Sequence, residues 1–226
     1  MPQSDATCWT MVARAAKGDE TARSEFAQQY LSIVRAYLSA RWRQGPMLKW
    51  YDDAVQDVFL ECLRPEGPLA RVKADGSGRF RSFLFAVVRN IARRYEERRD
   101  TTAEKSRGDS VLNIVQANDE SIATAFDKAW AKAMLTRAGE RHRAKAETEG
   151  PESLRRVKIL KLRFGSNRPV REIAAELEMD VEVVHVEYRK ARAEFKSALR
   201  EEVLFHNPDS QATIEQECLK LLELLR

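Results

Sequence analysis

Four side chains between positions 185 and 196 have the chemistry and the spacing to bind phosphates along one face of a helix. They recur at steps of three or four residues, which places them on one side of a helix: His185, Arg189, Arg192 and Lys196. An apolar stripe repeats the same spacing one residue earlier, in Val184, Tyr188, Ala191 and Phe195. We therefore expect a buried stripe beside a cationic one, as a DNA-recognition helix needs.

The element that must position this helix precedes it directly. The stretch "VREIAAELEMDVEVVHVEYRKARAEF", residues 170–195, predicts two short helices around a tight turn. Glu187 falls on the other flank of the apolar stripe, so its charge need not oppose the phosphates. This pattern predicts a helix-turn-helix.

A second cationic face is expected on the helix "RFRSFLFAVVRNIARRYEERRD", residues 79–100. Its buried stripe would consist of Phe80, Leu84, Val87, Val88, Ile91 and Tyr95. The residues that point away from the stripe are Ser82, Ala86, Arg89, Asn90 and Arg93. Small residues between arginines would let a DNA strand approach closely, and nearby phenylalanines could stack on opened bases. A solvated arginine face over an ordinary aromatic core is the alternative.

An acidic helix is expected at residues 51–64, "YDDAVQDVFLECLR". Its charged residues before Arg64 are Asp52, Asp53, Asp57 and Glu61. None of these acids has a basic residue four positions later, so the arrangement favours an external cationic partner. Carboxylates used in hydrolysis or metal binding would come with a histidine or a metal-spaced partner, which is not visible here.

Other patterns argue against an enzyme, a metal site and a bound cofactor. The "DGSG" stretch lacks the lysine and hydroxyl residue of a phosphate-binding loop. The three histidines have no ligand-spaced neighbours in the sequence. Cys8, Cys62 and Cys218 are widely spaced and odd in number, which argues against a disulfide framework or a zinc site. We expect a protein that binds macromolecules and does no catalysis.

The fold expected around these helices is all-α, because helical periodicity dominates and alternating β-branched runs are nearly absent. We predict two small helical domains at residues 1–100 and 121–203, a flexible linker at 101–120, and a C-terminal helical extension at 204–226. No signal peptide or membrane-spanning run is visible, so we expect a cytoplasmic protein. The net charge is only +4, so any affinity for nucleic acid depends on where the charges lie.

Taken in order, these segments resemble the extracytoplasmic-function sigma factors of the sigma-70 family, the small two-domain promoter-recognition subunits of bacterial RNA polymerase. "DDAVQDVFLECL" followed by "GRFRSFLFAVVRNIARRYEERR" resembles region two. The stretch at 170–195 resembles the helix-turn-helix of region four, and "FDKAWAKAMLTRAGERHRAKAE" is similar to the opening of region four in one subgroup. The resemblance extends from residue 10 to residue 203.

The resemblance implies a role for each surface. The acidic helix would dock on the clamp of the polymerase's largest subunit through Asp52, Asp53, Gln56, Asp57, Phe59 and Glu61. The arginine helix would read and help open the minus-ten element through Arg79, Arg81, Ser82, Arg89, Asn90 and Arg93. The last helix would read the major groove of the minus-thirty-five element with Glu182, His185, Val186, Arg189, Arg192 and Lys196.

The implied partners are core RNA polymerase at its clamp and flap, double-stranded promoter DNA, the opened strand, and an anti-sigma or other regulatory protein. The chain departs from the family at the turn, where Glu178, Met179 and Asp180 replace the usual glycine and small hydroxyl residue. It departs again at Val186 and Glu187, where serine and arginine are frequent. A sigma-like adaptor or competitor that binds polymerase without reading promoters is therefore the alternative function.

A simple helix-turn-helix repressor would leave the acidic helix without a role.

The C-terminal segment "DSQATIEQECLKLLELLR" puts Ile214, Cys218, Leu221, Leu222 and Leu225 on one helical face. Because most apolar stripes cover a core, we expect this helix to pack on the protein, although it could instead be a docking surface.

Overall fold

The computed structural model describes residues 7–43, 46–64, 80–106, 119–207 and 213–225. Within these ranges every regular element is a helix and no strand is present, which confirms the all-α prediction. The chain divides into two compact units. The first comprises Met1–Ala133, Leu204–Gln211 and Lys220–Arg226, and the second comprises Met134–Val203 and Ala212–Leu219.

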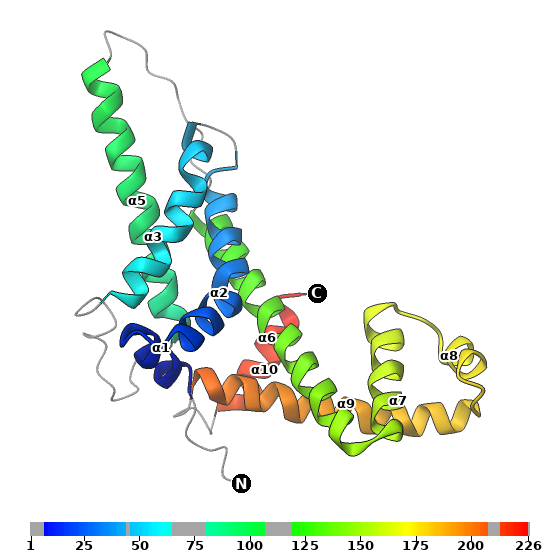
Figure 1. Cartoon of the computed structure of the whole chain (residues 1–226). Helices are drawn as coiled ribbons and strands as arrows, with labels where there is room; N and C mark the ends of the chain where they lie inside the picture. The colour runs from blue at the N-terminus through cyan, green and yellow to red at the C-terminus, as the bar shows by residue number, and fades with distance from the viewer. Residues whose placement is uncertain (1–6, 44–45, 65–79, 107–118, 208–212, 226) are drawn as a thin grey trace. The chain divides into compact units, whose positions relative to one another are not determined.

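The first unit is built from α1 (Cys8–Ala16), α2 (Glu20–Arg41), the short η1 (Pro46–Trp50), α3 (Tyr51–Leu63) and α5 (Phe80–Ser106), with the start of α6 (Asp119–Glu149). Helices α2, α3 and α5 pack against one another, and α1 packs on α2 (Figure 1). Helix α5 continues to Ser106, six residues into the segment expected to be a linker. The rest of that segment, residues 107–118, lies outside the described residues.

Local signals explain where the first helices begin. Thr7 and Thr10 form a capping box at the start of α1, each side chain accepting a hydrogen bond from the other's backbone N–H. Gly18 turns the chain with a φ of +98°, and Asp19 then accepts a hydrogen bond from Ala22 N to start α2. The hydrogen bond from Ala22, followed by that from Arg14, lowers the pKa of Asp19 below its ordinary value.

Aromatic side chains fill the core of the first unit. Phe26, Tyr30 and Phe80 are fully buried, and their ring centroids lie 4.9 to 6.3 Å apart. The start of α6 adds Phe126 and Trp130 to the same cluster. The apolar stripe predicted for α5 is buried from Phe80 to Ile91, and Tyr95 at its end is half-buried. Helical periodicity therefore identified the packed faces.

The second unit contains the end of α6, α7 (Pro151–Leu160), the one-turn η2 (Lys161–Gly165), α8 (Val170–Glu176) and most of α9 (Val181–His206). Gly150, with a φ of +111°, and Pro151 at the first helical position separate α6 from α7. Ile159, Ile173, Ala174 and Val184 form a core that joins α7, α8 and α9.

The last helix, α10 (Ile214–Glu223), buries part of the apolar stripe predicted for it. Ile214, Cys218 and Leu221 of its predicted stripe are buried, whereas Leu225 and the off-stripe Leu219 are exposed. Among the described residues, no helix is long and apolar enough to cross a membrane.

Candidate functional site

The outward face of α3 is acidic at its beginning. Asp52, Asp53 and Gln56 are exposed, and Asp52 makes a long ion pair of 3.8 Å with Arg35 of α2. At the other end of the helix Glu61 forms an ion pair of 3.3 Å with Arg64, three positions later. None of the acids has a basic residue four positions later, as the sequence shows, but Glu61 finds a local partner three positions away and is less available to an external one. Asp52 and Asp53 remain the acids that this surface presents to solvent.

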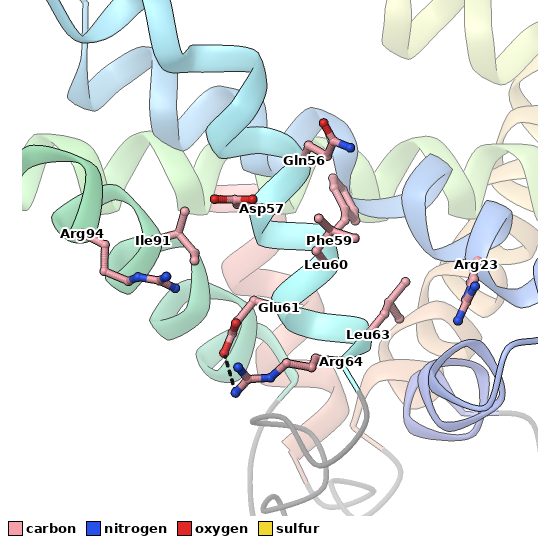
Figure 2. Close-up of a pocket in the computed structure, with 10 residues that line it drawn as sticks. All are labelled: Arg23, Gln56, Asp57, Phe59, Leu60, Glu61, Leu63, Arg64, Ile91 and Arg94. Atoms are coloured by element: carbon pink, nitrogen blue, oxygen red, sulfur yellow. Dashed lines mark ion pairs between the residues drawn. The ribbon is translucent and has the colours of Figure 1, made fainter. Parts of the chain in front are cut away.

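A groove with a volume of about 520 Å³ lies beside this acidic face. Its apolar lining comes from Phe59, Leu60 and Leu63 of α3 and Ile91 of α5, and arginines and carboxylates surround them (Figure 2). Leu60 is 60% exposed. A single exposed leucine is ordinary on a protein surface, but here it lines an apolar groove together with Phe59, Leu63 and Ile91, and such a groove can take an apolar side chain.

Leu60 was missed as a site residue, although the sequence contained a signal. It is an apolar residue that falls off the buried stripe of its helix, which runs through Ala54, Val55, Val58 and Cys62. Phe59, which was predicted as a site residue, is half-buried and packs edge-to-face on Phe26, with ring centroids 5.6 Å apart. Phe59 therefore anchors α3 in the core as much as it lines the groove.

Asp57 links the acidic helix to the arginine helix. Its carboxylate accepts a hydrogen bond of 2.9 Å from the Tyr95 hydroxyl of α5. Burial, followed by this hydrogen bond, raises the pKa of Tyr95 to about 12, so the phenol stays protonated and donates at neutral pH. The next residue of α5, Glu96, accepts hydrogen bonds from Arg41 and Trp42 and fixes α5 against α2. Asp57 is thus a structural contact as well as a surface charge.

The arginine face of α5 is exposed, as its helical periodicity predicted. Ser82, Arg89, Asn90 and Arg93 are all exposed. Arg93 is held by an exposed ion pair of 3.1 Å with Glu97, whereas Arg89 has no acidic partner among the described residues. Arg81 forms an ion pair with Asp127 of α6, which neutralises its charge. Arg79 lies outside the described residues.

A tight turn joins α8 to α9 in the second unit. The N–H of Met179 donates to the carbonyl of Ala174 at 2.9 Å, and the N–H of Glu178 donates to that of Ala175 at 3.4 Å. Glu178 takes a φ of +51°, the left-handed conformation that glycine favours at this position. Met179 packs on the core next to Ile173. The chain therefore makes the turn without a glycine.

Glu187 has a structural partner that the sequence did not show. Its carboxylate, only 16% exposed, lies 3.4 Å from Arg156 of α7 and 2.8 Å from Lys190. Arg156 also pairs with Glu194 at 2.7 Å. The hydrogen bonds from Lys190 and then from Arg156 keep the pKa of Glu187 below its ordinary value. Glu187 therefore fixes α9 against α7 and does not belong to the outward face.

The outward face of α9 carries the predicted cations, but one of them, Lys196, forms an ion pair with another helix. His185, Arg189, Arg192 and Lys196 are exposed, and Arg192 lies 5.8 Å over the Tyr188 ring. Lys196 forms an ion pair of 2.7 Å with Glu215 of α10, which also lies 3.1 Å from Arg200. No local sequence signal could have shown this contact. Glu182 and Val186 are exposed, as is Val183, which was not predicted as a site residue.

The buried histidines and cysteines form no metal centre within the described part of the chain. His142 pairs with Glu194 at 3.1 Å, and His206 lies 2.9 Å from the Tyr30 hydroxyl. All three cysteines are buried. These histidines and cysteines pack the two cores.

The described residues thus present an acidic face with an apolar groove in the first unit, and arginine-bearing faces in both units. The chain was also compared with known proteins. No protein-family model matches the sequence, and the search of curated proteins finds no significant match.

Proposed function

We propose that the chain is a promoter-recognition subunit of bacterial RNA polymerase, similar to the extracytoplasmic-function sigma factors. The observation that carries the proposal is the pairing of two unlike surfaces in one compact unit. The acidic face of α3 and the arginine face of α5 belong to helices that pack directly on each other. One surface suits a cationic protein partner and the other suits DNA, so the unit brings a protein to a nucleic acid.

The acidic face of α3 would bind the polymerase clamp. Asp52 and Asp53 would attract the cationic partner, and the groove next to Leu60 would take an apolar side chain from it. Apolar burial would then supply most of the affinity, while the exposed acids would steer the encounter and fix the orientation.

The arginine face of α5 would bind the minus-ten region. Arg89 and Arg93 would contact phosphates, and Asn90 lies between them with an amide that can bond a base edge. Arg81, which is paired with Asp127, contributes less to this face than the sequence suggests. In the second unit, α9 would enter the major groove of the minus-thirty-five region with His185, Arg189 and Arg192.

The first experiment identifies the promoters. Transcript starts are mapped genome-wide after forced expression of the chain, and the promoter found most often is tested with purified chain and purified core polymerase. We expect transcripts from that start only when the chain is present. If the chain binds core polymerase but directs no start, it is the adaptor or competitor; if it does not bind core polymerase, the proposal is wrong.

Two variants then separate the two faces. Asp53→Arg with Gln56→Arg should weaken binding to core polymerase by about ten-fold or more, because like charges would oppose the clamp. Asp57 is left intact because it holds Tyr95. Glu25→Arg, the same type of charge change at an exposed position of α2, is the control and should bind normally.

The DNA face is tested with Arg89→Ala together with Arg93→Ala. This pair should reduce promoter opening, measured by permanganate reactivity of unpaired thymines, while polymerase binding stays normal. Lys17→Ala together with Arg43→Ala removes two exposed charges elsewhere in the first unit and is the matched control. If the α3 and α5 variants lose the same step equally, the assignment of two separate faces is incorrect.

A further inference from the structure

The first two turns of α9 expose apolar side chains on a face that otherwise carries charge. Val183 is 47% exposed and Val186 is 40% exposed, whereas Val184 between them is fully buried in the core of the second unit. A single exposed valine is ordinary on a protein surface. Two of them, three positions apart at the start of the same helix, form a small apolar patch on its outward side.

The charges around this patch indicate what covers it. The segment Val181–Tyr188 contains no lysine or arginine, and the exposed arginines Arg189 and Arg192 follow within the next turn. Arg189 has no acidic partner within the described part of the chain, so its charge is available for a phosphate. A helix that enters the major groove contacts base edges with its N-terminal residues. On this helix those residues are mainly valines, and the phosphate-binding arginines come after them.

The chemistry of the base edges then selects the ligand. In the major groove the methyl group of thymine is the apolar feature of a base edge, while guanine presents two acceptors that arginine usually reads. The first two turns of α9 have no lysine or arginine that could read these guanine acceptors. A patch of valine methyl groups therefore matches thymine better than any other base.

We propose that Val183 and Val186 read thymine methyl groups in the major groove, so that the DNA site of α9 contains thymine at one or two positions facing these valines. This inference rests on the proposed function, because it assumes that α9 enters duplex DNA. It adds the base that the helix prefers and the two residues that set the preference.

The test removes the methyl group and leaves every hydrogen bond of the base in place. The preferred duplex is selected from a random library with the full chain bound to core polymerase, and each thymine in it is then replaced by deoxyuridine. We expect replacement at one or two positions to weaken binding by about four-fold each, the effect of losing one buried methyl group. Replacement at the remaining thymines should change nothing.

Variants link the effect to the valines. Val183→Ala and Val186→Ala should each lose the sensitivity to deoxyuridine at one position while keeping the salt dependence that the arginines confer. Both positions are exposed, and alanine favours a helix, so both variants should fold. Val181, the first residue of the same helix, is also exposed but points about 140–160° around the helix axis away from Val183 and Val186. Val181→Ala is therefore the control and should keep the full sensitivity.

The outcomes separate the inference from the proposed function. If the selected site binds tightly but is insensitive to deoxyuridine, or if the alanine variants remain as sensitive as the parent protein, the methyl-reading role is wrong and the proposed function stands. If the selection yields no preferred sequence although the chain binds polymerase, both fail. Loss of sensitivity in the two valine variants alone supports the inference.

Discussion

The turn between α8 and α9 yields a prediction about stability that does not depend on function. Helix α8 ends with a pair of hydrogen bonds, from Met179 to Ala174 and from Glu178 to Ala175, of the kind that usually surrounds a glycine. Here the residue that takes the left-handed conformation, just after the C-cap Leu177, is Glu178, with a φ of +51°. We predict that Glu178→Gly stabilises the second unit.

The expected magnitude follows from two opposing terms. A residue with a Cβ pays roughly 1–2 kcal/mol in the left-handed conformation, and glycine avoids this cost. Glycine also gains freedom in the unfolded chain, which offsets about 0.4–1 kcal/mol. Because the Glu178 side chain is exposed, little else is lost on substitution. The net change in the free energy of unfolding should therefore be about +0.5 to +1 kcal/mol.

The measurement is hydrogen exchange of the full chain, read for the peptides that cover α8 and the start of α9. A gain of about 1 kcal/mol should slow exchange in these peptides by roughly five-fold. Glu178→Ala is the matched control, because it removes the same side chain but keeps the Cβ. It should change the exchange by little.

A second comparison uses Asn167, which also takes a positive φ, of +49°. Asparagine tolerates this conformation better than glutamate does, so Asn167→Gly should stabilise less than Glu178→Gly. If Glu178→Gly exchanges as fast as Glu178→Ala, the left-handed backbone carries no strain at this turn and the reasoning is refuted.

Three further predictions concern a buried ion pair, a buried thiol and a surface ion pair. Glu202→Ala should lower the free energy of unfolding, measured by urea denaturation, by about 3–5 kcal/mol, because this carboxylate is only 3% exposed and lies 2.6 Å from Arg137. A loss below about 1 kcal/mol would show that the buried ion pair does not stabilise the fold. Burial raises the pKa of Cys62 to about 12, so a thiol reagent at pH 8 should modify it only after urea unfolds the chain. Glu215→Gln should free Lys196 and Arg200 and steepen the salt dependence of DNA binding by about one to two phosphate contacts, measured by fluorescence anisotropy. An unchanged slope would show that neither cation reaches DNA.

Much of the helical architecture could be predicted from the sequence, because amphipathic helices show a local periodicity of apolar residues. The stripe from Phe80 to Ile91 is buried, and in the α9 stripe Val184 and Ala191 are buried while Tyr188 and Phe195 are half-buried. The exposure of Arg89 and Asn90 follows from the same periodicity, because these residues do not lie on the face of α5 that packs on the core.

Contacts between distant residues could not be predicted in this way. The sequence placed Asp57 among the surface acids, yet it holds Tyr95, 38 residues further along the chain. It showed Glu187 only as an acid off the cationic face, and the structure pairs it with Arg156, 31 residues earlier. Neither pair has a fixed spacing that a pattern could reveal, because the distance between two helices depends on how they pack.

The sequence by itself therefore determined that the chain is helical, which faces of its helices are buried, and where acidic and basic side chains gather along it. The tertiary structure decided which of those charges are available. It engages Lys196 with Glu215, neutralises Arg81 with Asp127, and leaves Arg89 and Arg189 open to solvent. The reason is physical: periodicity is a property of neighbouring residues, whereas an ion pair exists only where folding brings two distant charges within a few ångströms.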